Sequence, residues 1–120
     1  SATQRDRPVM NVQVLVVCSR NRWRSPTAEK LINGLPGFEA RSAGTSAAAR
    51  VRVNERHIAW AEIILVMEHH HARRLREMFG DALAGKPVHC LDVPDDYQFM
   101  DPELVALLQQ RLAECLPSSA

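Results

Sequence analysis

Residues 12–17 are β-branched or apolar apart from Gln13, which is typical of a strand buried on both faces of a parallel sheet. An aperiodic loop follows at residues 18–24. Ser25 can then cap a helix, Pro26 suits the first helical turn, and Glu29 adds negative charge near its N-terminus. The order of strand, loop and helix predicts the beginning of an α/β fold.

The rest of the chain continues this alternation. We expect further strands at residues 38–43, 63–67 and 88–91, and helices at 54–61, 69–79 and 102–116. Such alternation implies right-handed crossovers and a single-domain, three-layer α/β sandwich: a four-stranded parallel sheet with helices on both faces and a phosphate-binding loop after strand 1. Ligands of such sheets bind beyond the carboxyl ends of the strands, where we expect Cys18, Gly44, Glu68 and the loop after Leu91.

Length and composition limit the class of protein. A chain of 120 residues predicts one domain, which we place at residues 11–117 after a flexible segment at 1–10. The longest apolar runs are too short to span a bilayer, and we expect no signal peptide and no membrane partner. Three widely separated cysteines argue against a disulfide scaffold and favour a reducing, cytoplasmic setting.

Charge is segregated along the chain. Residues 19–76 carry eleven Lys/Arg and five Asp/Glu, a net charge of +6, whereas residues 77–120 carry a net charge of −6. The first part therefore suits an anionic ligand. The overall net charge of +1 argues against a dedicated nucleic-acid surface, so nucleic acid is expected only as a substrate.

The loop after the first strand has the spacing Cys-x5-Arg-Ser and ends at a helix start. In such a loop, successive backbone N–H groups converge on one point, and the positive end of the helix dipole adds to them. Arg24 can offer a planar fork to two phosphate oxygens, and Cys18 at the base of this positive bowl is favoured as a nucleophilic thiolate. We predict that the whole loop binds phosphate through Ser19, Arg20, Asn21, Arg22, Trp23, Arg24 and Ser25.

Several stretches resemble the low-molecular-weight protein tyrosine phosphatases, in a short, divergent, bacterial-like form. The matching residues are 14–18, Asn21, Arg24-Ser25-Pro26, Ala28-Glu29, Arg41-Ser42-Ala43-Gly44-Thr45, 63–68 and 93–97. The resemblance implies that Cys18 forms a phosphocysteine and that Arg24 holds the equatorial oxygens. It implies supporting roles for three residues: a left-handed Asn21 that shapes the loop, Ser25 donating to the thiolate, and Ser42 bonded to Asn21.

The resemblance also implies a general acid in the late acidic loop. Asp95 is our first choice and Asp96 the second, while Asp101 precedes Pro102 and more simply caps the last helix. Tyr97 and Asp96 are expected to line the substrate cleft. A histidine that braces the phosphate loop in many members is expected after Thr45; Ala48 stands near its place, so the brace is expected to be missing.

The predicted function is hydrolysis of phosphomonoesters through a phosphocysteine, without cofactor or metal. The alternative is an enzyme with the same site acting on nucleotides, RNA ends or other small phosphoesters, because Arg20, Arg22 and Trp23 enrich the loop in charge and stacking surface. Arsenate reduction is less favoured, because it needs a nearby cysteine pair that Cys90 and Cys115 do not form. A non-catalytic binding module is also less favoured, because the nucleophile and the acid are both present. The expected partners are a phosphorylated substrate and inhibitory phosphate or other oxyanions.

His69, His70 and His71 diverge along a helix and are expected to form its solvated start rather than one metal site.

Overall fold

The central strand of the fold is β1 (Val12–Cys18), flanked on both sides by parallel neighbours. A computed structural model describes residues 11–117; the predicted flexible segment at 1–10 lies outside the described residues. The other strands are β2 (Phe38–Gly44), β3 (Ile63–Val66) and β4 (Val88–Cys90), and the sheet order is β2-β1-β3-β4. The predicted four-stranded parallel sheet is confirmed.

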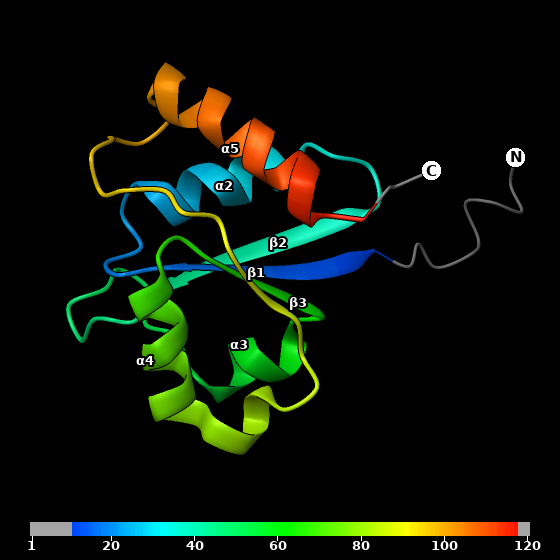
Figure 1. The fold of residues 1–120 in the computed structure, drawn as a ribbon, viewed down its shortest axis with the longest axis vertical. Coiled ribbons are helices and arrows are strands. Elements are labelled where there is room, and N and C mark those ends of the chain that lie inside the picture. The colour runs from blue at the N-terminus through cyan, green and yellow to red at the C-terminus, as the bar shows by residue number, and fades with distance from the viewer. Residues whose placement is uncertain (1–10, 118–120) are drawn as a thin grey trace, which may run out of the picture.

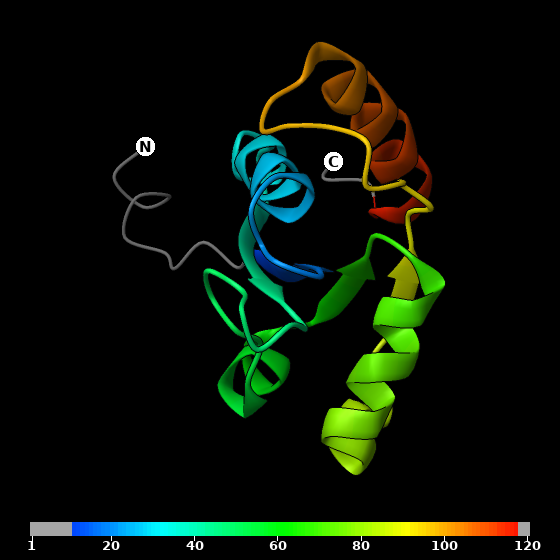
Figure 2. The same ribbon diagram turned by 90° about the vertical axis from the view of Figure 1, so that its left-hand side faces the viewer.

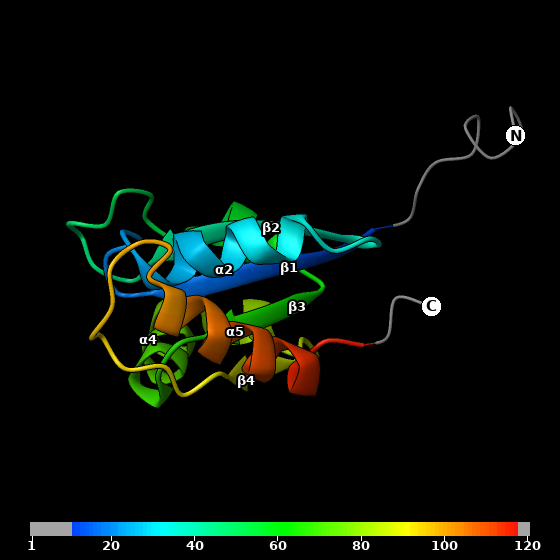
Figure 3. The same ribbon diagram turned by 90° about the horizontal axis from the view of Figure 1, so that it is seen from above.

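Alternation along β1 produces two separate cores. Val14, Val16 and Cys18 face α2 (Arg24–Asn33) and α5 (Pro102–Cys115). Leu15 and Val17 face the opposite side, which is covered by α3 (Glu55–Trp60) and α4 (His69–Phe79). Figure 1 shows the two helix pairs on opposite sides of the sheet, Figure 2 shows the three layers, and Figure 3 shows α2 and α5 side by side. The three-layer arrangement is therefore as predicted.

The helix ends agree with the sequence in most places. Asn54 caps α3, and Asp101 caps α5 with Pro102 in its first turn. Ser25 is not the cap of α2, because the helix begins one residue earlier, at Arg24, and the Ser25 hydroxyl is engaged in the preceding loop. A short 3-10 helix, η1 (Gly80–Leu83), follows α4 and was not predicted.

The carboxyl ends of the strands form one rim, as expected. Cys18 is in register with Gly44, and the N–H of Thr45 donates to the Cys18 carbonyl at 3.0 Å. On the other side, the N–H of Met67 donates to the Val17 carbonyl at 3.1 Å, and the N–H of Val93 donates to the Met67 carbonyl at 2.8 Å. These bonds place the segments that follow β2, β3 and β4 beside the end of β1, where the loop begins. None of the helices described by the structure is long and apolar enough to cross a membrane.

Candidate active site

The Cys18 sulfur ends β1 in a buried position where hydrogen-bond donors surround it. The backbone N–H of Asn21 lies 3.2 Å from Sγ, and the Ser25 hydroxyl lies 3.0 Å from it. Because the Ser25 oxygen already accepts from the Asn21 amide at 2.9 Å, its own proton is available to the sulfur. Donors aimed at sulfur stabilise its anionic form, which is the nucleophilic one.

Asn21 shapes the loop through its backbone. Its φ is 55°, the left-handed conformation that Asn tolerates better than most residues. The turn directs the carbonyl of Asn21 outward, where it accepts from Arg50 Nε at 3.1 Å. The left-handed conformation expected from the sequence is therefore present.

The loop rests on the segment that follows β2. The N–H groups of Ser46 and Arg50 donate to the carbonyls of Ser19 and Arg20, at 2.9 and 3.0 Å. Gly44 makes this approach possible, since an added Cβ would lie 2.4 Å from the Ser19 carbonyl oxygen. These bonds fix the backbone of the loop, in which the Asn21 N–H is turned toward the Cys18 sulfur.

Arg24 is buried and held by three groups from distant parts of the chain. Its Nη1 donates to Glu68 Oε1 at 2.6 Å and to the Val93 carbonyl at 2.9 Å. Its Nε lies 3.6 Å from Asp95 Oδ1. Burial alone would raise the pKa of the Glu68 carboxyl, but the hydrogen bond and charge of Arg24, together with a smaller effect of His70, keep it below its ordinary value. Glu68 is thus ionised at neutral pH and fixes the guanidinium.

A histidine braces the phosphate loop, contrary to the expectation from Ala48. His71 is fully buried, and its Nδ1 accepts from the Glu68 backbone N–H at 3.0 Å. Its Nε2 lies 2.8 Å from the Ser19 hydroxyl. Burial, then the charges of His70 and Arg24, lower the pKa of His71 to about 4, against an opposing effect of Glu68. The neutral ring therefore carries its proton on Nε2 and donates it to Ser19.

The prediction of a solvated helix start is wrong for His71, although His69 and His70 are exposed. The missed signal is the spacing of Glu68 and His71 at the ends of a capping box, which turns the third residue of the helix back toward the loop.

The expected bond between Ser42 and Asn21 is wrong. The Ser42 hydroxyl donates instead to Glu29 Oε1 at 2.5 Å, joining β2 to α2. A carboxylate is a stronger acceptor than an amide oxygen, and Glu29 lies within reach on the facing helix. The side-chain oxygen of Asn21 has no hydrogen-bond partner within residues 11–117. Ser42 thus supports the helix that begins at Arg24 rather than the loop itself.

The phosphate loop opens into a pocket of about 480 Å³. Its lining residues are Cys18, Ser19, Arg20, Arg22, Trp23, Arg24 and Asp95. Trp23 is 37% exposed, with the Arg22 guanidinium 5.1 Å from its ring centre. Asn21 and Ser25, which were expected to bind phosphate, are buried and do not line this pocket.

The structure separates the side chains of the acidic loop that were expected at the site. Asp95 reaches the pocket, whereas Asp96 does not line it. Tyr97 is partly buried against the core between the sheet and α5, away from the lining, because the loop turns its ring inward. The expected lining role of Asp96 and Tyr97 is therefore not seen in this arrangement.

Two groups of side chains beside the site have the spacing of metal ligands. One contains Glu68, His70 and His71, and the other His69, Cys90 and Asp92. In the first group, Glu68 and His71 are already engaged with Arg24 and Ser19. Burial raises the pKa of the Cys90 thiol against the opposing effect of a backbone hydrogen bond at Asp92, and the negative charges of Asp92 and Glu68 add to the rise, so the thiolate is disfavoured. Neither group lies in the pocket of Cys18.

Comparisons with known proteins agree with this geometry. The model of a family described as low molecular weight phosphotyrosine protein phosphatase matches residues 13–62. No curated protein matches the chain significantly. Among solved structures, the YwlE arginine phosphatase from Geobacillus stearothermophilus is 26% identical over 87% of this chain and 92% of its own, with a TM-score of 0.64.

Two further structures share the fold at lower identity. The tyrosine phosphatase Wzb from Escherichia coli K30, in complex with phosphate, is 22% identical over 88% of this chain and 96% of its own, with a TM-score of 0.71. The low molecular weight protein tyrosine phosphatase from T. tengcongensis is 23% identical over 88% of this chain and 100% of its own, with a TM-score of 0.69. The likeness thus extends well beyond the residues matched by the family model.

Proposed function

We propose that the chain is a member of the low molecular weight phosphotyrosine protein phosphatase family, whose model matches residues 13–62, and that it hydrolyses phosphomonoesters through a phosphocysteine on Cys18. The observation that carries this proposal is the meeting of Cys18, Arg24 and Asp95 in one pocket. The three groups supply the nucleophile, the oxyanion ligand and the acid that such a reaction needs.

In the first step, the Cys18 thiolate attacks phosphorus and the bond from phosphorus to the leaving oxygen breaks. Asp95, in its protonated form, gives its proton to that oxygen. Arg24 and the loop N–H groups bind the other phosphate oxygens. Because Glu68 and Val93 fix Arg24 from behind, its guanidinium is oriented before the substrate arrives.

In the second step, the ionised Asp95 removes a proton from water, and the resulting hydroxide attacks phosphorus. The bond from sulfur to phosphorus breaks, inorganic phosphate leaves and the thiolate is restored. Ser25 and the Asn21 N–H stabilise the departing sulfur anion. Inorganic phosphate and similar oxyanions should therefore compete with the substrate.

The default substrate is a protein phosphotyrosine, and a small phosphoester is the second candidate. Exposed Trp23, together with Arg20 and Arg22 at the pocket, favours the second candidate, because a base or sugar could stack and pair there.

Arsenate reduction is less well supported, since neither Cys90 nor Cys115 lines the pocket. A non-catalytic module is also less well supported, because nucleophile, arginine and acid are all present. We place the protein in the cytoplasm on its cysteine content alone.

Turnover of p-nitrophenyl phosphate tests the proposal, measured with EDTA between about pH 5 and about pH 8. We expect no turnover with Cys18→Ser, and a loss of about 10²- to 10⁴-fold with Asp95→Asn. Asp96→Asn is the matched control and should remain within a few-fold of wild type. Turnover that survives Cys18→Ser, or a larger loss in the control than in Asp95→Asn, contradicts the assignment.

A further inference from the structure

The phosphate pocket is the middle of three neighbouring hollows. On one side it shares Arg22 with a hollow of about 740 Å³ beside α2. On the other side it shares Ser19 with a hollow of about 450 Å³ between the segment after β2 and α4. We call these the α2 hollow and the α4 hollow. Because α2 and α4 cover opposite faces of the sheet (Figure 1), the two hollows extend from the phosphate pocket toward opposite faces.

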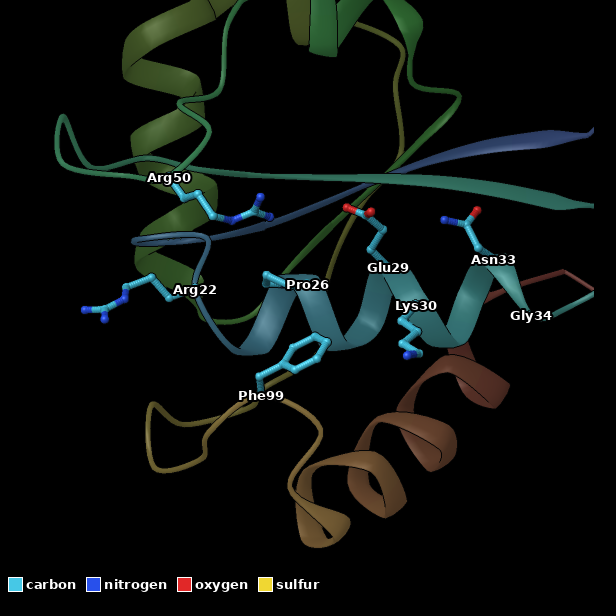
Figure 4. A pocket seen from close by; sticks show the side chains of 8 residues that line it. All are labelled: Arg22, Pro26, Glu29, Lys30, Asn33, Gly34, Arg50 and Phe99. Carbon is cyan, nitrogen blue, oxygen red and sulfur yellow. The ribbon is translucent and has the colours of Figure 1, made fainter.

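The α2 hollow, drawn in Figure 4, combines positive charge with apolar surface. Its cations are Arg22, Lys30 and Arg50. Phe99, 48% exposed, lies beside the first turns of α2 in Figure 4, where a bond from the Met100 N–H to Thr27 Oγ1, at 3.0 Å, anchors its segment. The one carboxylate of this lining, Glu29, already accepts from Ser42.

The α4 hollow is also positively charged. It is lined by Ser19, Thr45, Ser46, Ala47, Arg52, His70, Arg73, Arg74 and Glu77. Glu77 is the one carboxylate among them, and it pairs with Arg74 at 3.6 Å. Within residues 11–117, no carboxylate forms an ion pair with Arg52, Arg73 or Lys30. Each hollow therefore presents uncompensated positive charge to solvent.

Resting on the function proposed above, we propose that the substrate is an acidic polypeptide segment lying across all three hollows. Its phosphorylated residue occupies the pocket of Cys18, and Asp or Glu side chains on its two flanks lie near Lys30 and Arg73. The positive hollows attract these side chains by charge complementarity. Phe99 adds apolar contact with one flank.

The position of the hollows on both sides of the phosphate pocket favours a polypeptide over a nucleotide. A phosphomonoester stands at the end of a nucleotide or an RNA chain, so such a substrate leaves the pocket in one direction only. A phosphorylated side chain within a polypeptide has chain on both sides. Each hollow also has the volume of a complete small-molecule site, about 300–1,000 Å³, which exceeds the needs of one small ester.

The test compares four phosphotyrosine peptides that are acidic on both flanks, on the N-terminal flank, on the C-terminal flank, or on neither. Exposed charge pairs each contribute about 2- to 5-fold, so kcat/KM of the doubly acidic peptide should exceed that of the neutral peptide by about tenfold. The advantage should shrink as salt is raised.

Two charge reversals assign the flanks. Lys30→Glu should remove the advantage of one acidic flank and Arg73→Glu that of the other, with p-nitrophenyl phosphate turnover unchanged. Arg76→Glu, on the same helix as Arg73 but outside the hollow, is the matched control. Kd values of the four peptides for the Cys18→Ser protein should follow the same order, which tests the flanks independently of turnover.

Equal kcat/KM and Kd for the four peptides overturns the proposal, as does a control variant that acts like Arg73→Glu. A nucleotide hydrolysed faster than every peptide also overturns it. In each of these cases p-nitrophenyl phosphate is still hydrolysed. Loss of that activity, or its survival in Cys18→Ser, would instead contradict the proposed chemistry.

Discussion

The guanidinium of Arg24 and the carboxylate of Glu68 meet at 2.6 Å, which ties the phosphate loop to the carboxyl end of β3. Arg24 is almost fully buried, whereas Glu68 is one-third exposed. The pair therefore orients a cation that has little access to water. A phosphate entering the pocket meets an arginine whose position is already fixed, which lowers the cost of ordering it on binding.

Glu68→Gln should weaken oxyanion binding while leaving the fold intact. The amide keeps the size of the carboxyl but not its charge, and hydrogen bonds to charged groups contribute about 1.5–3 kcal/mol. Because Glu68 is partly exposed and the Val93 carbonyl still holds Arg24, we expect a loss of about tenfold in kcat/KM. The inhibition constant of phosphate should rise in parallel. Glu114→Gln, exposed on α5, is the control, and an equal effect there would contradict the role of the pair.

His71→Gln should change how stability depends on pH. The folded-state pKa of His71 is about 4, against 6.5 for a free histidine. The unfolded chain thus binds more protons between these values, so the contribution of this residue is complete above about pH 6.5 and declines as pH falls toward about pH 4. Urea titrations should show a shallower pH slope in this window for His71→Gln than for wild type. His89→Gln is the control, and an unchanged slope in His71→Gln would contradict the buried, neutral state.

Gly44→Ala should disturb the phosphate loop. The added methyl group would lie 2.4 Å from the Ser19 carbonyl and 2.7 Å from the Ala49 side chain, so one segment has to move. Overpacking of this kind costs about 1–3 kcal/mol, and we expect a matching fall in unfolding free energy together with reduced turnover. Gly34→Ala is the matched control, because its nearest contact is 3.4 Å. The account fails here if the two variants are equally stable and active.

Phosphotyrosine should be preferred to phosphoarginine in otherwise identical peptides. Phosphoarginine is the relevant competing substrate, because the YwlE structure, 26% identical to this chain, is that of an arginine phosphatase. Arg20 and Arg22 line the pocket mouth here, and they would repel the cationic guanidinium of phosphoarginine but not a neutral aromatic ring. Measured kcat/KM values decide the matter, and a higher value for phosphoarginine would contradict this interpretation.

The fold was predictable because the central strands β1 and β3 are mostly apolar on both faces, and because the helices have an amphipathic pattern or an end signal. The resemblance to a known family supplied the left-handed Asn21, whereas the nucleophile Cys18 and the arginine Arg24 were predictable from the sequence itself. They lie on one loop between a strand and a helix, so their proximity follows from short sequence spacing.

The parts that sequence could not supply depend on contacts between distant segments. Glu68 and Val93 reach Arg24 across 44 and 69 positions, and His71 reaches Ser19 across 52. A run of three histidines also does not show that one of the three side chains, that of His71, is buried. Ser42 was given the wrong partner because that partner was taken from the family resemblance, which does not show that Glu29 on the facing helix is the nearer acceptor in this chain.

Formation of a phosphocysteine is the central claim and can be measured directly. During turnover of p-nitrophenyl phosphate, the Asp95→Asn protein should accumulate the intermediate, because the base that activates water is missing. After acid quenching, the account predicts one added phosphoryl group in the mass of the protein, carried by the peptide that contains Cys18. Turnover with no phosphorylated Cys18 at any quenching time, or with the phosphoryl group on another residue, would contradict it.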